Sequence, residues 1–245
     1  MHELIPILRA IELIEEHLRD EINVAEMADA AGYSLFHFIR TFDQIVFHTP
    51  YDYLMRRRLS EAANNLVSSN CRVVDIAMDY GFSNHETFSR AFKRMFHMQP
   101  TQWRERGVIA RRSLMPPISL AYLEHIHQPG IQRPEVIEMG RRYLAGLMAP
   151  ITGQHEAIEK LWSDLGRVLD TLPLMKKPRN YLGLTTYLDG TPEEAYYLAA
   201  VEVSQFDAFS PLLVHQTLPA GKYARLVHCG PADTLPLTLD YLYHT

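Results

Sequence analysis

The chain has 245 residues, 47% of them hydrophobic, and a formal net charge of -5 at pH 7. This length and hydrophobic content suffice for two ordinary domains with buried cores, which argues against a disordered chain. No cationic segment leads into an apolar one near the N-terminus and no run of about 18 apolar residues occurs, so we expect a soluble, cytoplasmic protein. The two cysteines, Cys71 and Cys229, are far apart in the sequence and indicate neither a disulfide framework nor a metal site, and no cofactor is expected.

The first predicted helix covers roughly Leu4 to Leu18, because apolar residues recur there at helical spacing. A short helix follows from Val24 to Ala31, and Gly32 is expected to end it in a left-handed conformation. Another helix then starts at Ser34.

A long helix is predicted from Pro50 to about Val67, and it carries three consecutive arginines, Arg56 to Arg58. After it, a short helix from Val74 to Tyr80 is followed by Gly81. The tetrapeptide from Ser83 to Glu86 resembles a capping box for a helix that continues to about Phe96. A last helix opens at Pro100, which gives seven in all.

The sequence repeats itself after about fifty positions, and such periods usually mark repeated structural units. The matched residues are Ala28 with Ala77, Gly32 with Gly81, Phe38 with Phe88, Arg40 with Arg90, Phe42 with Phe92 and Pro50 with Pro100. Each copy reads as two helices joined by a short turn with glycine, the pattern of the DNA-binding helix-turn-helix. A single copy also occurs in plain structural bundles, but two copies with matched glycine, arginine and aromatic residues favour tandem DNA-binding units.

Basic residues cluster in the first half, whereas the acidic excess lies mainly in the second half. Such a one-sided distribution favours a nucleic-acid partner in spite of the negative net charge, although any single cluster also fits a solvated surface. The candidate phosphate contacts are Arg57, Lys93, Arg94 and Arg104.

The second unit carries the clearer set of candidate base contacts. With Phe88 and Phe92 turned inward, the opposite stripe of its second helix holds His85, Glu86, Ser89 and Arg90. Arginine can donate two hydrogen bonds to guanine, and glutamate can accept one from the cytosine amino group. Glu86 has an equally plausible structural role as the third residue of the capping box.

The equivalent stripe of the first unit is less polar. Phe36 and Ile39 suit contacts with thymine methyl groups, and Arg40 is the obvious bidentate donor. The alternative is that Leu35 and Ile39 complete the core. We therefore expect the second unit to supply more base discrimination and the first more positioning.

The predicted secondary structure changes from helices alone to a mixture of strands and helices after a proline-containing connection, residues 111–134. Strands are predicted at 136–139, 143–147, 181–187, 196–203 and 222–227, and helices at 155–172 and 235–243. This order describes an α+β domain with an antiparallel sheet and two similar halves, following an all-α tandem helix-turn-helix domain.

The first half strongly resembles the AraC/XylS family of bacterial transcription regulators. The match covers Ile5 to Gly107 and rests on Asp75-Ile76-Ala77, Gly81-Phe82-Ser83, Arg90-Ala91-Phe92-Lys93 and Pro100. The resemblance implies a DNA-binding domain over residues 1–110 whose two recognition helices enter successive major grooves of double-stranded DNA at a bipartite site. RNA polymerase is a further expected partner, and no membrane partner is expected.

The second half, residues 135–245, resembles the GyrI-like effector-binding domain, including Gly221-Lys222-Tyr223 before a strand. The resemblance implies a small aromatic or cationic effector, and the sequence departs from it by stopping within the second helix, before two expected closing strands. Aromatic faces and a carboxylate attract organic cations, so the candidate effector contacts are Tyr143, Trp162, Tyr187 and Glu202. Each of these residues also fits a core position.

Two other functions remain open for the second half: it could bind another protein, as a gyrase inhibitor does, or it could be a small hydrolase. No nucleophile elbow, paired histidine ligands or glycine-rich phosphate loop supports catalysis. The chain is therefore expected to be a regulator and not an enzyme.

Overall fold

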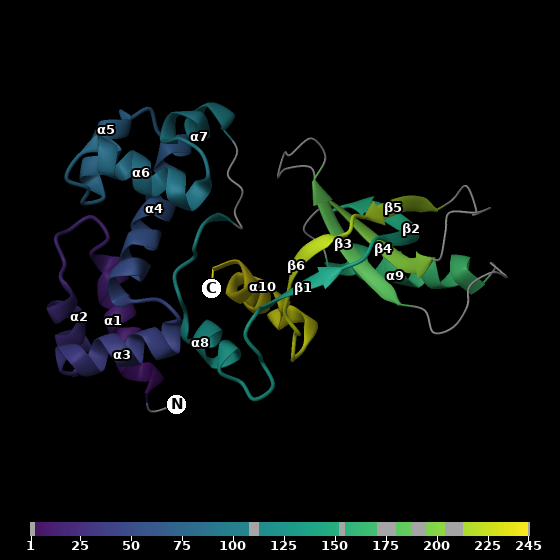
Figure 1. Ribbon diagram of the computed structural model, residues 1–245, viewed down its shortest axis with the longest axis horizontal. Coiled ribbons are helices and arrows are strands. Elements are labelled where there is room, and N and C mark those ends of the chain that lie inside the picture. The colour runs from purple at the N-terminus through teal and green to yellow at the C-terminus, as the bar shows by residue number, and fades with distance from the viewer. Residues whose placement is uncertain are drawn as a thin grey trace. The chain divides into compact units, whose positions relative to one another are not determined.

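The computed structural model describes residues 3–107, 113–151, 155–170, 180–187, 195–203 and 213–244 (Figure 1). These form two compact units. The helical unit contains the chain up to Glu135 together with the segment from Arg225 onward, and the sheet unit contains Val136–Ala224.

Seven helices fill the part of the helical unit that precedes Gly107, a stretch that is described without a gap from residue 3. They are α1 (Leu4–Glu16), α2 (Val24–Ala31), α3 (Leu35–Val46), α4 (Pro50–Ser68), α5 (Val73–Asp79), α6 (His85–Phe96) and α7 (Pro100–Arg106). Their order and type confirm the all-α prediction. In Figure 1, α4 runs from the level of α3 to that of α6 and so joins the two helix-turn-helix pairs.

Two hydrophobic clusters divide this bundle. The first cluster lies around Ile7, Ile11, Met27, Phe38 and Phe42, and the second lies around Leu66, Ile76, Phe88, Phe92 and Trp103. The N-terminal part of α4 contributes Leu54 to the first cluster, and its C-terminal part contributes Leu66 to the second. Each helix-turn-helix pair therefore has its own core, and α4 belongs to both.

The helix ends explain why the turns form where they do. Gly32 and Gly81 have φ angles of 69° and 74°, in the left-handed region that favours glycine. Asn23 and Glu26 form a capping box at α2. The capping box predicted from Ser83 to Glu86 is wrong, because Asn84 is the N-cap of α6 and its side chain accepts from the Thr87 amide at 2.8 Å.

The segment predicted as a connection holds another helix, α8 (Leu120–Ile126). Met115, Ile118, Leu123 and Ile126 are buried in the first hydrophobic cluster. The C-terminal helix α10 (Leu235–His244), after a short 3-10 turn η3 (Ala232–Thr234), packs on α8 and buries Tyr241 in the same cluster. Residues 113–126 and 235–244 thus complete the core of the first helix-turn-helix pair.

The sheet unit confirms the predicted antiparallel α+β architecture. Its main sheet has the order β3 (Tyr181–Tyr187), β4 (Ala195–Val203), β2 (Arg142–Pro150) and β5 (Val214–Leu218), with every neighbouring pair antiparallel. Helix α9 (His155–Asp170) packs on β2 and β4. A separate two-stranded sheet pairs β1 (Glu135–Met139) with β6 (Gly221–Arg225). Strand β5 was not predicted from the sequence.

The two faces of the main sheet have separate cores. Ala145, Ala199 and Val201 pack with Leu165 and Leu169 of α9. On alternate positions, Leu144, Leu198 and Ala200 form a second cluster with Leu182 and Leu218. None of the helices among the described residues combines the length and the hydrophobicity that a membrane-spanning helix requires.

Candidate nucleic-acid interface

Helix α6 presents a charged stripe to solvent. Phe88 and Phe92 are fully buried and Phe96 nearly so, which turns the opposite side of the helix outward. That side carries Glu86, Arg90, Lys93 and Arg94, all exposed, and His85 in the first turn is exposed and Ser89 half-buried at the edge of this stripe. These residues recur at intervals of three and four, so they form one face of the helix.

The polar groups of this face are available to a ligand. Within the described residues, the side chains of Arg90 and Lys93 make no hydrogen bond or ion pair, and His85 Nε2 lies 3.4 Å from Ser89 Oγ. Because Asn84 caps the helix, Glu86 is not needed as a capping-box residue. Glu86 lies in the first turn and Lys93 and Arg94 in the last, the placement that the helix dipole favours.

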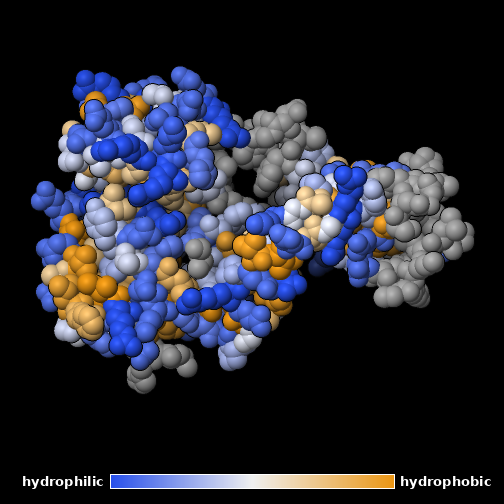
Figure 2. Space-filling view, in the orientation of Figure 1, coloured by the Kyte–Doolittle hydropathy of each residue, from blue (hydrophilic) through white to orange (hydrophobic). Residues whose placement is uncertain are grey.

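Helix α3 presents an apolar stripe at the equivalent positions. Phe38 and Phe42 are buried, whereas the side chains of Leu35, Phe36 and Ile39 are 48%, 81% and 39% exposed. Figure 2 shows a hydrophobic patch over the end of the helical unit where α2 and α3 lie. The alternative in which Leu35 and Ile39 complete the core is therefore not what the structure shows. Arg40 is exposed beside them.

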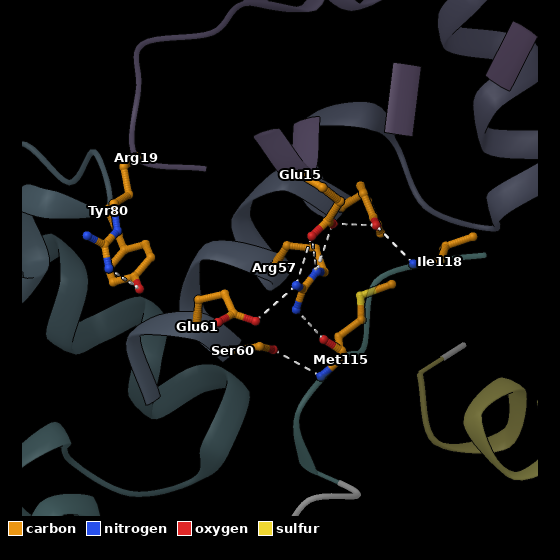
Figure 3. A network of polar contacts seen from close by, with 9 residues as sticks. Glu15, Arg19, Arg57, Ser60, Glu61, Tyr80, Met115 and Ile118 are labelled. Carbon is orange, nitrogen blue, oxygen red and sulfur yellow. Dashed lines mark hydrogen bonds and ion pairs between the residues drawn. The ribbon is translucent and has the colours of Figure 1, made fainter. Parts of the chain in front are cut away.

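Arg57 does not belong to this surface, which corrects the expected phosphate contact. It is 2% exposed and lies in a polar network with α1 and the segment after α7 (Figure 3). Its guanidinium binds both carboxylate oxygens of Glu15, donates to Glu61 at 3.0 Å and donates to the Met115 carbonyl at 2.6 Å. With these bonds made inside the protein, a phosphate has no access to the guanidinium.

The same network anchors the segment that leaves the seven-helix bundle. The Met115 amide donates to Ser60 Oγ at 2.9 Å, and the Ile118 amide donates to the Tyr53 hydroxyl at 3.2 Å. The Tyr53 hydroxyl in turn donates to Glu15, and burial, then the Glu15 charge, raises the pKa of Tyr53. One face of α4 thus holds residues 115–118 through their backbone.

Of the other candidate phosphate contacts, Lys93 and Arg94 are exposed, whereas Arg104 has an internal role. Its side chain donates to the carbonyls of Leu66 at 2.9 Å and Cys71 at 2.6 Å, which satisfies the C-terminal end of α4. Sequence reasoning overlooked Arg72, which is 79% exposed directly before α5 and pairs with Asp75. A basic residue at the start of a helix-turn-helix's first helix is the signal that could have identified it.

The candidate effector contacts of the sheet unit do not converge. Trp162 lies on the α9 side with Tyr197, to whose hydroxyl its indole N–H donates at 3.3 Å. Tyr143 pairs with Val203 and shares that side. Glu202 alternates to the opposite face, where Asn180 donates to it at 2.8 Å. The side chain of Tyr187 lies outside the described residues.

The described residues contain no group of three or more histidine, cysteine or acidic side chains that could hold a metal ion. The helical unit presents two exposed helix faces, a charged one on α6 and an apolar one on α3.

Comparison with known proteins gives two family matches. A helix-turn-helix domain model matches residues 27–106, and the model of the GyrI-like small molecule binding domain matches residues 132–245.

Three curated relatives illustrate the similarity. The regulatory protein SoxS of Escherichia coli is 38% identical over 96 residues, which cover 39% of this chain and 90% of SoxS. The transcriptional regulator Rob of Salmonella typhimurium is 26% identical over 219 residues, 89% of this chain and 75% of Rob. The HTH-type transcriptional regulator YbfP of Bacillus subtilis is 38% identical over 96 residues, 39% of this chain and 32% of YbfP.

Proposed function

The chain belongs to the AraC/XylS family of transcription regulators, and we propose that it binds a bipartite site on double-stranded DNA through α3 and α6. In this proposal each helix enters one of two successive major grooves. The region that matches the GyrI-like model, residues 132–245, binds a small-molecule effector. The protein acts in the cytoplasm as a regulator, and RNA polymerase is its second macromolecular partner.

The observation that carries the proposal is the unpartnered charged stripe of α6. An exposed arginine without an internal partner is free to donate two hydrogen bonds to guanine, and Arg90 meets this condition. Glu86, one turn earlier, is placed to accept from a cytosine amino group, while His85 and Ser89 serve base edges or phosphates. Lys93 and Arg94 are assigned to phosphates.

Helix α3 contacts DNA differently in this proposal. Phe36 and Ile39 contact thymine methyl groups and Arg40 supplies a bidentate donor, so α3 makes fewer hydrogen bonds to base edges than α6 does. We therefore assign most base discrimination to α6 and more of the positioning to α3.

Selection of bound fragments from a random DNA pool tests the bipartite site. Arg90→Ala is expected to relax base preference at one position of one half-site, a loss of roughly tenfold in discrimination. Lys93→Ala is expected to weaken all sequences alike and to lower the slope of log affinity against log salt by about one. Arg9→Ala is the matched control, since Arg9 is exposed on α1 and lies outside both helix-turn-helix pairs.

The proposal fails if the selected fragments contain one half-site only, or if Arg90→Ala and Arg9→Ala give the same base preferences.

Effector binding is tested separately by tryptophan fluorescence, because the sequence contains only two tryptophans. Trp103 is buried in the helical unit, so Trp103→Phe leaves Trp162 as the reporter of the sheet unit. Titration with tetraphenylphosphonium, an aromatic cation, is expected to quench that signal.

A further inference from the structure

The segment that leads into the first helix-turn-helix pair meets the turn of the second pair at a joint formed by four residues: Arg19, Arg58, Tyr80 and Gly81. Arg19 follows α1 and Arg58 lies within α4, while Tyr80 and Gly81 form the turn between α5 and α6. We call these residues the inter-unit joint.

Arg58 occupies the middle of the joint. It is 6% exposed, and its guanidinium donates to the carbonyls of Leu18 at 2.8 Å and Asp20 at 2.5 Å, in the turn that leads from α1 toward α2. On its other side it lies against Gly81, where an added Cβ would be 2.6 Å from Nη1 and 2.9 Å from Cζ. Arg58 therefore bridges the lead into the first pair and the turn of the second.

Arg19 makes the second contact across the joint. Its guanidinium carbon lies 5.1 Å from the centre of the Tyr80 ring, and Nη2 donates to the Tyr80 hydroxyl at 3.2 Å (Figure 3). The hydrogen bond and the charge interaction with Tyr80 raise the pKa of Arg19. Tyr80 is 4% exposed and packs in the second hydrophobic cluster, so it is held in place from behind.

These contacts act on the two recognition helices. Residues 18–20 are bound from two sides and lead into α2 and α3, while Gly81 leads directly into α6. Helix α4 contributes to both cores, and Met95 of α6 packs against both hydrophobic clusters. The joint adds polar contacts between the two pairs away from the α4 axis, and these contacts oppose a rotation of one core against the other.

We propose that the inter-unit joint determines the spacing between the two half-sites that the protein accepts. This inference rests on the proposed bipartite binding. One inserted base pair moves a half-site by about 3.4 Å and turns it by about 35° around the duplex axis. A rigid joint makes the protein unable to follow this change, and a loosened joint lets it follow.

The two turn glycines provide a matched pair of variants. Gly32 and Gly81 have nearly equal φ angles, so alanine introduces similar backbone strain at either position. An added Cβ at Gly32 meets nothing within 4 Å, whereas at Gly81 it would displace the Arg58 guanidinium. Gly81→Ala therefore disturbs the joint, and Gly32→Ala controls for the strain. Arg19→Ala is a second variant of the joint. Because the Arg19 side chain is exposed, its removal should not prevent folding.

The experiment compares the affinity of the full chain for selected bipartite DNA with its affinity for the same DNA carrying one inserted or one deleted base pair. The wild-type protein and Gly32→Ala are expected to show the same preference for the selected spacing. Arg19→Ala and Gly81→Ala are expected to reduce that preference by about threefold or more, the change that one exposed cation–π contact corresponds to. Base preferences within each half-site should stay unchanged in all four proteins.

Binding of each single half-site separates this inference from the proposed function. If wild-type protein binds bipartite DNA no better than one half-site, the proposed function itself is wrong. If bipartite binding holds but both joint variants keep the wild-type spacing preference, or Gly32→Ala changes it as much as Gly81→Ala, the joint does not set the spacing.

Discussion

Arg57→Ala distinguishes a buried structural arginine from a phosphate contact. The substitution removes an arginine side chain that is 3% exposed and leaves the Glu15 side chain, which is 20% exposed, with the Tyr53 hydroxyl as its remaining hydrogen-bond donor among the described residues. Glu61, the other acidic partner, is 35% exposed and retains water as a partner. Most of the cost therefore comes from Glu15 and from the freed Met115 carbonyl.

Breaking a buried ion pair by removing one partner costs about 3–5 kcal/mol, because the other charge stays buried without compensation. For a unit of this size that corresponds to a fall of about 10 °C in melting temperature. Burial opposes the charge of Arg57, but the hydrogen bond and charge of Glu15 outweigh it and raise the pKa of Arg57, so Arg57 stays charged at neutral pH.

Thermal unfolding followed by circular dichroism measures the effect, with Arg56→Ala as the neighbouring control. Arg56 is 37% exposed and pairs with Asp52 one turn earlier, an arrangement worth at most about 1 kcal/mol. Well below its melting temperature, Arg57→Ala should keep wild-type base preference and salt dependence. A variant with unchanged melting temperature and a salt slope reduced by about one would refute this reasoning and restore the phosphate role.

Three further outcomes follow from single contacts. Asn84→Ala should destabilise the protein by about 1 kcal/mol in denaturant unfolding, because it removes the α6 cap, while Ser83→Ala should change little; the reverse order would favour a serine cap. Burial, with smaller contributions from Arg56 and His48, lowers the pKa of His244 to about 4. Since the unfolded value is about 6.5, stability present above that pH is lost as pH falls toward 4, and His244→Leu should flatten this part of the profile. Phe36→Ala should lower DNA affinity without lowering the melting temperature, and replacing thymine by deoxyuridine in the half-site should weaken the wild-type protein but not this variant.

The seven helices follow from local signals. Regular apolar spacing in α1, α4 and α6 and the two turn glycines were enough to predict them in order. The α6 cap was misplaced by one residue because serine and asparagine adjoin there and both are good N-caps. Only the backbone geometry decides between them.

The role of Arg57 was misassigned for a reason that helical geometry makes clear. Arg57 and Arg58 lie three and four residues after the buried Leu54, so both share its face, and only Arg56 points away. Helical spacing therefore places Arg57 and Arg58 on the buried face of α4, whereas the prediction treated the three consecutive arginines as one basic surface. Its acidic partner, Glu15, is on another helix, and such a non-local pair leaves no local sequence pattern.

Helix α8 and the docking of α10 escaped prediction for a related reason. Seven residues of α8 make too short a window for periodicity, and the segment is flanked by prolines that suggest a loop. The burial of Met115, Ile118 and Tyr241 depends on surface left open by α1 and α3, residues far away in the sequence. Tertiary contacts and not local propensity fold this part of the chain.

The unequal stripes of α3 and α6 bear on how the two helices divide recognition. Phosphate and base-edge contacts from charged side chains weaken as salt displaces them, whereas methyl contacts from apolar side chains do not depend on counterions. Under the proposed mode of binding, the protein should keep part of its affinity at high salt through α3 and take its base discrimination from α6. Both helices must bind DNA at the same time for this division to hold. The contacts that fix their relative position, α4 and the inter-unit joint, should therefore affect binding as much as the side chains that touch the bases. In the proposed complex Phe36 would be buried against DNA, which would account for an exposed aromatic side chain that is costly in water.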